Sequence, residues 1–289
     1  MMGKDIKRVI GSAPFLVTLL IIIVFMLMTR VEVIEPNGES VSKSLLLLLV
    51  TQDKEWFLQQ SITRESVFFS IPNMEITEMV TILASFPFLY QFCEERKRGV
   101  IRYKILRQGK WKYYLSKCIS CVCSGAMLFG MAALIFWAVL CVFLPGMEEV
   151  GGDSQEVFYT IYQTPFSEYF RTSLGGFLVY GAVAALPGFV IAAFTYDIYL
   201  CIVLPFLGNY MLILFHSWLY SRLNTGNVTV HGWKKNLLEQ LYQYGTLDQF
   251  FWGWHEENQK GLILLGLIVV VVCGIVFCVR MNKRRDLGE

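Results

Sequence analysis

The chain has 289 residues, of which 55% are hydrophobic and only 17% are charged, and its mean hydropathy is +0.50. A soluble domain carries about a quarter charged residues and cannot hide this much apolar surface in one core, so the composition excludes an ordinary soluble globular protein. The net charge of +2 is nearly balanced, which makes the positions of the charges more informative than their sum. We expect a single all-α integral membrane domain over residues 1–289.

Six apolar stretches are long enough to cross a membrane, because a spanning helix needs about 20 mostly apolar residues. In chain order they cover about residues 9–29, 74–92, 118–144, 174–196, 198–218 and 261–279. The second stretch is the weakest, since Glu75 and Glu78 lie in its first turns, although residues 79–92 carry no charge. The first stretch is too long for the apolar part of a secretion signal, so we expect it to remain as a helix.

The segments between these helices alternate in charge. The N-terminus, residues 93–117 and the tail 280–289 hold three, nine and four basic residues, or 16 of the 25 in the chain. Residues 30–73 and 145–171 are acidic or mixed. Because basic flanks stay in the cytoplasm, we predict that both termini and residues 93–117 are cytoplasmic and that 30–73, 145–171 and 219–260 are extracytoplasmic.

Two of the predicted extracytoplasmic segments have internal features. Residues 45–50 are apolar but too short to span, so we expect a strand or a helical piece there. Residues 219–260 combine a helix-like stretch, 233–244, with an aromatic run at 250–254. Aromatic side chains favour the membrane interface, which predicts a partly re-entrant or interfacial segment between the fifth and sixth helices. An ordinary packed extracellular loop explains the same residues equally well.

Sequence motifs for catalysis are absent. The chain has no H-E-x-x-H, no G-x-S-x-G and no G-x-x-x-x-G-K-[ST] sequence, so it does not hydrolyse ATP by P-loop chemistry. The eight cysteines lie in or beside apolar stretches, and the cluster of Cys118, Cys121 and Cys123 leads directly into a predicted span. We interpret them as packing residues rather than metal ligands, and we expect no cofactor, no metal and no enzymatic activity.

The most informative segment is CEERKRGVIRYKILRQGKWKYYLSK, residues 93–117. Apolar residues recur among basic ones in its first half, in the pattern of an amphipathic helix. A basic loop attracted to anionic headgroups is one interpretation, and a cytosolic docking element is the sharper one.

Here the sequence resembles the membrane subunits of the type-2 ABC exporter family. These proteins carry an acidic residue, a glycine four residues later, an apolar pair, a proline and a basic residue, and then a lysine that opens the third helix. The matching positions in this chain are Glu95, Gly99, Ile105, Leu106, Lys112 and Lys117. Gly109 stands where the family usually has proline. The six-helix layout and the long segment between the last two helices are also similar.

The resemblance implies that residues 94–110 form a coupling helix on a separate ATPase subunit, with residues 4–10 as an amphipathic helix on the inner membrane surface. The implied coupling residues are Glu94, Glu95, Gly99, Ile105, Leu106 and Lys112, with the two glutamates favoured at the start of that helix. Closure of two ATPases would push the coupling helices together and switch two membrane subunits, identical or sister chains, from inward- to outward-open. The resemblance places the chain in the plasma membrane of a bacterium.

The composition of the spans indicates a class of substrate, and an alternative function stays open. Spans that are poor in charge and rich in aromatic residues suit an amphipathic peptide, drug or lipid-like molecule better than a small ion, and export of antimicrobial peptides for immunity fits this architecture. Membrane lipids are expected partners and nucleic acids are not. The alternative is a stand-alone membrane protein without transport activity, either an immunity or binding protein or a membrane-embedded enzyme.

Overall fold

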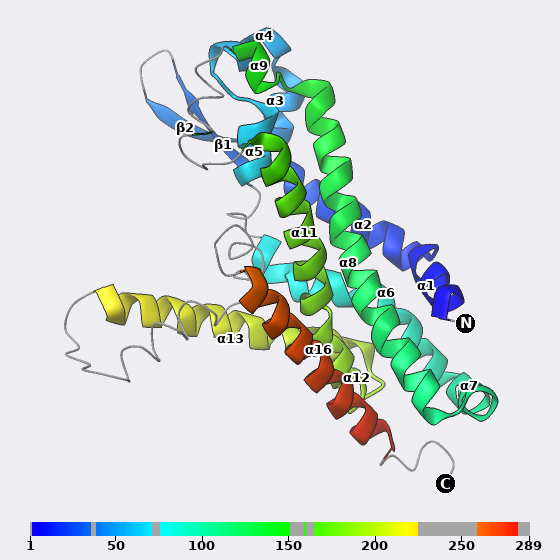
Figure 1. The fold of residues 1–289 in the computed structure, drawn as a ribbon. Helices are drawn as coiled ribbons and strands as arrows, with labels where there is room; N and C mark the ends of the chain where they lie inside the picture. Colours follow the sequence, from blue (N-terminus) through cyan, green and yellow to red (C-terminus); the bar gives the residue numbers. More distant parts are fainter. Residues whose placement is uncertain are drawn as a thin grey trace.

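The computed structural model describes residues 2–35, 39–70, 76–150, 159, 165–224 and 259–282. Most of this part of the chain is helical (Figure 1). In chain order the elements are α1 Met2–Ile10, α2 Ala13–Leu27, β1 Arg30–Ile34, β2 Ser40–Ser44, α3 Leu45–Thr51, α4 Lys54–Gln59, α5 Arg64–Ser70, α6 Ile76–Lys97, α7 Val100–Gln108, α8 Lys110–Phe143, α9 Met147–Val150, α11 Phe166–Ala184, α12 Leu186–Ala192, α13 Ile198–Asn224 and α16 Gln259–Asn282.

Four helical segments of the described chain are long and apolar enough to cross a membrane. They are Lys110–Val150, Phe166–Ala192, Ile198–Leu219 and Leu264–Asn282, and they match the last four predicted spans. The other two predicted spans correspond to α2 and α6. At 15 residues, α2 is only about 23 Å long, which is shorter than the hydrocarbon core of a bilayer. Membrane crossing by α2 and α6 therefore stays a prediction.

The first predicted span, 9–29, is divided into two helices. Ser12 ends the first helix and begins the second: its backbone is extended, and its hydroxyl accepts a hydrogen bond from the Phe15 amide at 3.4 Å. Pro14 in the first turn of α2 favours a helix start at this position. As a result α1 is a separate, strongly amphipathic helix, in the place where the sequence predicts one at residues 4–10.

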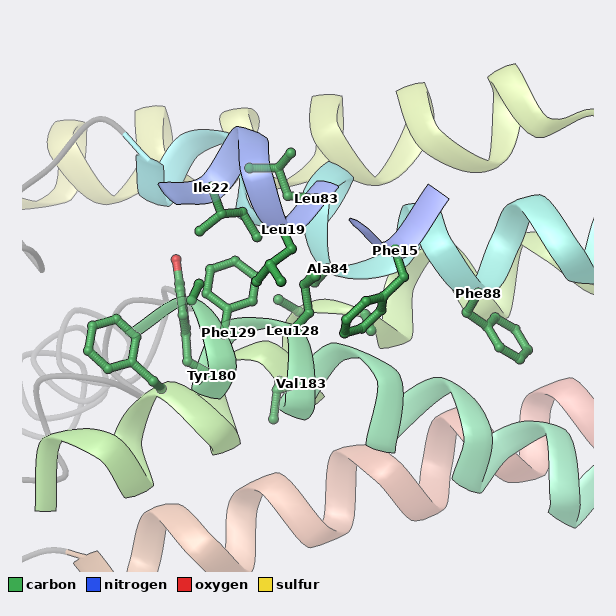
Figure 2. Close-up of a cluster of buried hydrophobic side chains, with 14 of the residues drawn as sticks. Phe15, Leu19, Ile22, Leu83, Ala84, Phe88, Leu128, Phe129, Tyr180 and Val183 are labelled. Atoms are coloured by element: carbon green, nitrogen blue, oxygen red, sulfur yellow. The ribbon is translucent and has the colours of Figure 1, made fainter. Parts of the chain in front are cut away.

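The centre of the molecule is the packing of α8 against α11, with α2 and α6 beside them. The two backbones approach so closely at Gly125 and Gly181 that a Cβ on either glycine would lie 2.3 Å from the carbonyl oxygen of the other. Small residues permit such crossings between membrane helices. Around this crossing, side chains of four helices form a buried apolar cluster (Figure 2). It includes Phe15, Leu19, Ile22, Leu83, Ala84, Phe88, Leu128, Phe129, Tyr180 and Val183.

A β-hairpin corrects the expectation of an all-α fold. β1 and β2 pair antiparallel, with Arg30 opposite Ser44 and Ile34 opposite Ser40. The first strand, RVEVI, alternates polar and apolar residues over its first four positions, which is the pattern of a half-buried strand, whereas SVSKS has a single apolar residue, Val41. The apolar residues 45–50 that follow form the helix α3.

The described parts of the two acidic or mixed segments lie at one end of the molecule, away from α7 (Figure 1). The Arg64 amide donates to the Pro145 carbonyl at 3.0 Å, and Lys54 forms an ion pair with Glu149 at 2.8 Å. The described parts of segments 30–73 and 145–150 therefore contact each other. Residues 225–258, which include most of the predicted interfacial segment 219–260, lie outside the described residues, as do 151–158, 160–164 and most of the tail, 283–289.

Candidate functional site

The basic segment 93–117 folds as the last turn of α6, the whole of α7 and the first turns of α8, at the end of the molecule opposite the hairpin (Figure 1). Two glycines bound α7: Gly99 has φ of 68° and Gly109 has φ of 82°. Side chains make this region of backbone space costly, and glycine enters it freely. Proline fixes φ near −65°, so Gly109 forms a turn that the proline common in the resembling family could not form.

The two faces of α7 have opposite environments. Ile101 and Ile105 point inward, and Ile105 is only 8% exposed. Leu106 is 84% exposed, and Tyr103 beside it also points into solvent. Of the apolar pair predicted to contact a partner, Leu106 is therefore available at the surface, whereas Ile105 anchors α7 to the helices behind it.

A buried carboxylate holds α7 in place. Glu95, with a side chain only 7% exposed, lies in the last turns of α6. Its Oε1 accepts hydrogen bonds from Lys104 Nζ of α7 at 2.6 Å and from Arg8 Nη1 of α1 at 3.2 Å. Lys117 Nζ of α8 lies 3.0 Å from Oε2 as an ion pair. One carboxylate thus joins four helices, and we call Glu95, Arg8, Lys104 and Lys117 the Glu95 cluster.

The lysines of the Glu95 cluster stabilise the ionised form of the Glu95 carboxyl. Burial alone would raise the pKa of the Glu95 carboxyl, but Lys117 and Lys104 outweigh burial and lower the pKa below its ordinary value. Lys117 is itself only 6% exposed, and so the pair consists of two charges largely removed from water. Such a pair tolerates the loss of neither partner, because the remaining charge would be buried without compensation.

The N-terminal helix is fastened beside α7 by further polar contacts. The Gln91 side-chain amide donates to the Arg8 carbonyl at 3.0 Å, and the Ser116 hydroxyl donates to Asp5 Oδ2 at 3.2 Å. With the Arg8–Glu95 contact, these bonds link α1 to both α6 and α8. The amphipathic helix is therefore attached to the same structural unit as the basic segment.

Arg96 connects this unit to α12. Its guanidinium donates to the carbonyl of Ala192, the last residue of α12, and to the carbonyl of Thr195 at 2.9 Å. A cation at the C-terminal end of a helix satisfies carbonyls that have no partner within the helix. The chain end of α16 reaches the same place, where the Arg280 guanidinium lies 4.9 Å from the centre of the Phe194 ring.

The residues predicted to contact the ATPase differ in their location and in their contacts. Glu94 and Glu95 lie at the C-terminal end of α6 rather than at the start of α7, because α6 continues to Lys97 and a two-residue turn, Arg98 and Gly99, precedes α7. Glu94 pairs with the exposed Arg98 at 2.6 Å. Lys112 is exposed in the first turn of α8 and takes no part in the Glu95 cluster.

Sequence reasoning missed Arg8, Lys104 and Arg96 as structural partners. Only Lys117 gave a signal, because a lysine that immediately precedes a long apolar stretch needs a counter-charge once it is buried. Within the described ranges, no group of three or more His, Cys, Asp or Glu side chains is placed to hold a metal ion. Comparison with models of protein families, with curated proteins and with solved structures finds no match.

Proposed function

We propose that this chain is the membrane subunit of an ATP-driven exporter and that α7 docks on a separate ATPase subunit. The observation that carries the proposal is the construction of α7: a nine-residue helix between two glycine turns, fixed through Ile101 and Ile105 on one face and presenting Leu106 on the other. An exposed leucine and tyrosine among cations resemble the apolar centre and charged surroundings of a protein interface.

The Glu95 cluster supplies a route for force from α7 to the rest of the chain. A push on α7 acts through Lys104 on Glu95, and through Glu95 on Lys117 at the base of α8. The Glu95 and Lys117 side chains are 7% and 6% exposed, so their ion pair is largely shielded from water. Arg96 would carry the same movement to the end of α12. Helices joined in this way would move as rigid bodies.

Two features support a path formed with a second membrane subunit, whether a copy or a sister chain. Much less of the apolar surface of α13 and α16 is buried than of α8 and α11, which leaves their faces available to lipid or to another subunit. The four apolar segments 118–146, 172–196, 198–221 and 261–279 contain no Asp, Glu, Lys or Arg. A path lined by such helices suits an amphipathic peptide, drug or lipid-like molecule, and the cell membrane of a bacterium is the proposed location.

The test is co-purification of the full chain from its native host in mild detergent. We expect the intact chain to bring down a protein with a Walker A sequence and Leu106→Asp to lose it, because the charge would lie at the centre of the docking surface. Val50→Asp is the matched control, since Val50 is equally an exposed apolar residue but lies in α3 at the opposite end. It should retain the partner.

The opposite result has a clear meaning. An intact, monodisperse chain that never brings down an ATPase would favour the alternative of a stand-alone membrane protein, which acts as an immunity or binding protein or as a membrane-embedded enzyme. Loss of the partner in both variants would show a general effect of added charge rather than a docking surface on α7.

A further inference from the structure

The short helix α3, at the end of the molecule that carries the hairpin, is apolar on both of its faces. Its inner face buries Leu45 and Leu48 in the core. Its outer face exposes Leu46, Leu47 and Val50, and Val50 is 78% exposed. Residues three and four apart share one face of a helix, so Val50 lies beside both leucines. We call Leu46, Leu47 and Val50 the α3 patch.

The composition of α3 does not suit a helix whose outer face lies in water. A surface helix of a soluble domain carries polar or charged residues on that face, and the sequence of α3, LLLLLVT, holds no charge. Its one polar side chain, Thr51, donates its hydroxyl to the Leu47 carbonyl at 2.8 Å, within the same helix. The outer face of α3 therefore suits an apolar environment.

Contacts on both sides of α3 place it at the ends of two apolar helices. At its start, the Leu45 amide donates to the carbonyl of Thr29, just beyond the end of α2, at 2.7 Å. Shortly after its end, Lys54 pairs at 2.8 Å with Glu149 of α9, which directly follows α8. Since α8 belongs to the candidate span Lys110–Val150, α3 lies where this span ends (Figure 1).

Apolar side chains are also exposed at the helix ends next to α3. Met28 is exposed at the end of α2, and Val142 and Phe143 are exposed at the end of α8. Directly after α3 the chain becomes polar, and the charged side chains of residues 53–55 are all exposed. A change from apolar to charged surface is typical of the boundary between hydrocarbon and water.

From these observations we propose that α3 lies on the membrane surface and inserts the α3 patch among the acyl chains of the lipids. With seven residues α3 is too short to span, so it contacts only the outermost part of the hydrocarbon. Lipid fits this patch better than a second copy of the chain, because a stable protein interface needs roughly 20–30 residues on each side. The proposal requires that α8 crosses the membrane and is independent of the exporter function.

The test is photo-crosslinking of the purified full chain in phosphatidylcholine vesicles. A photoreactive residue replaces Val50 or, as the matched control, Ile34, an apolar residue of β1 that is 63% exposed. The strand register places Ile34 about 14 Å along the hairpin from Arg30, which follows the end of α2. We expect the Val50 position to form adducts on lipid acyl chains in several-fold higher yield than the Ile34 position, as measured by mass spectrometry of the digested chain.

Each other outcome overturns the assignment in a different way. Absence of lipid adducts from Val50 would show that the α3 patch lies in water. Equal yields from Val50 and Ile34 would indicate general adsorption of the hairpin end to the vesicle. A crosslink from Val50 to a second copy of the chain, in place of lipid, would make the α3 patch an interface between copies.

Discussion

Two buried glutamates at opposite ends of the molecule are held in different ways. Glu65, at the end that carries the hairpin, is 5% exposed and pairs with its neighbour in sequence, Arg64, at 2.8 Å. It also accepts a hydrogen bond from the Met147 amide at 3.1 Å. Glu95, with nearly the same exposure, draws its cations from α1, α7 and α8.

The two glutamates are almost equally buried, but they differ in how many parts of the chain supply their partners. Glu65 closes one contact between the short helices α5 and α9, and its main counter-charge, Arg64, remains next to it in any conformation of the chain. Glu95 has a complete set of partners only when four helices are in their native positions. A change at Glu95 should therefore affect the whole basic end, whereas a change at Glu65 should stay local.

The largest expected effect comes from replacing each glutamate by glutamine. Glu95→Gln leaves the buried Lys117 without a counter-charge and should lower the free energy of unfolding by about 3–5 kcal/mol. Glu65→Gln keeps an acceptor for the Met147 amide and leaves Arg64 partly in water, which should cost about 1 kcal/mol. Reversible unfolding in mixed micelles measures both.

A second substitution sharpens this contrast. Lys117→Met in the Glu95→Gln background removes the stranded charge and should recover a large part of the lost stability. Equal costs for the two glutamine variants, or no recovery in the double variant, would contradict the central role of the Glu95–Lys117 pair.

The next effect concerns the turn that joins α7 to α8. Gly109→Pro should destabilise the basic end by about 3 kcal/mol, because proline cannot adopt a φ of 82° and loses the amide that donates to Ile105. At the opposite end, Ser61 adopts a φ of 53° without being glycine, so Ser61→Gly should change stability by less than about 1 kcal/mol. Hydrogen exchange on α7 would locate the first change. A Gly109→Pro variant with unchanged exchange would show that this turn is not formed as described.

The pH dependence of stability should test the contribution of the Glu95 carboxylate. The pKa of Glu95 is lowered in the folded chain, so its contribution is fully present above its ordinary value of 4.5 and is lost as the pH falls through the lower folded value. Melting of the intact chain between pH 7 and pH 3 should therefore show a loss of stability that Glu95→Gln lacks. The same slope in both proteins would mean that other carboxyls dominate acid unfolding.

The smallest effects distinguish the partners within the Glu95 cluster. Lys104→Ala removes a short bond to a charged acceptor in a half-buried place and should cost about 1.5 kcal/mol. Arg8 is 62% exposed, so Arg8→Ala should cost at most about 0.5 kcal/mol, and added salt should reduce even that. A larger cost for Arg8 than for Lys104 would reverse the ranking that burial implies. Thermal melting at two salt concentrations is sufficient.

The sequence predicted most of the long helices because apolar length is a local property. The last four predicted spans lie on four helical segments suited to crossing a membrane, and α8 merely begins earlier, at Lys110. The break at Ser12 was visible as a capping residue with a proline shortly after it, but the apolar length around it concealed the signal. The short hairpin was missed because strands of five residues give a weak pattern beside long apolar stretches.

The contacts of the candidate site were less accessible from the sequence. A helical pattern on 100–108 was readable, but it did not show that Ile105 and Leu106 would lie on opposite faces relative to the rest of the fold. Arg8 lies 87 residues from Glu95, and no local pattern encodes such a pairing. The charge of Lys117 demanded a partner, yet only the packing of α6 against α8 selects Glu95.

The measurement that tests the docking function of α7 most directly is site-specific photo-crosslinking in the native host. A photoreactive residue replaces Tyr103, which is exposed beside Leu106, or Val50, which is exposed at the opposite end. We predict that the Tyr103 position captures a protein that contains a Walker A sequence and that the Val50 position does not. Capture of that ATPase from Val50, or only of lipid from Tyr103, would contradict the assignment of α7 as the docking helix.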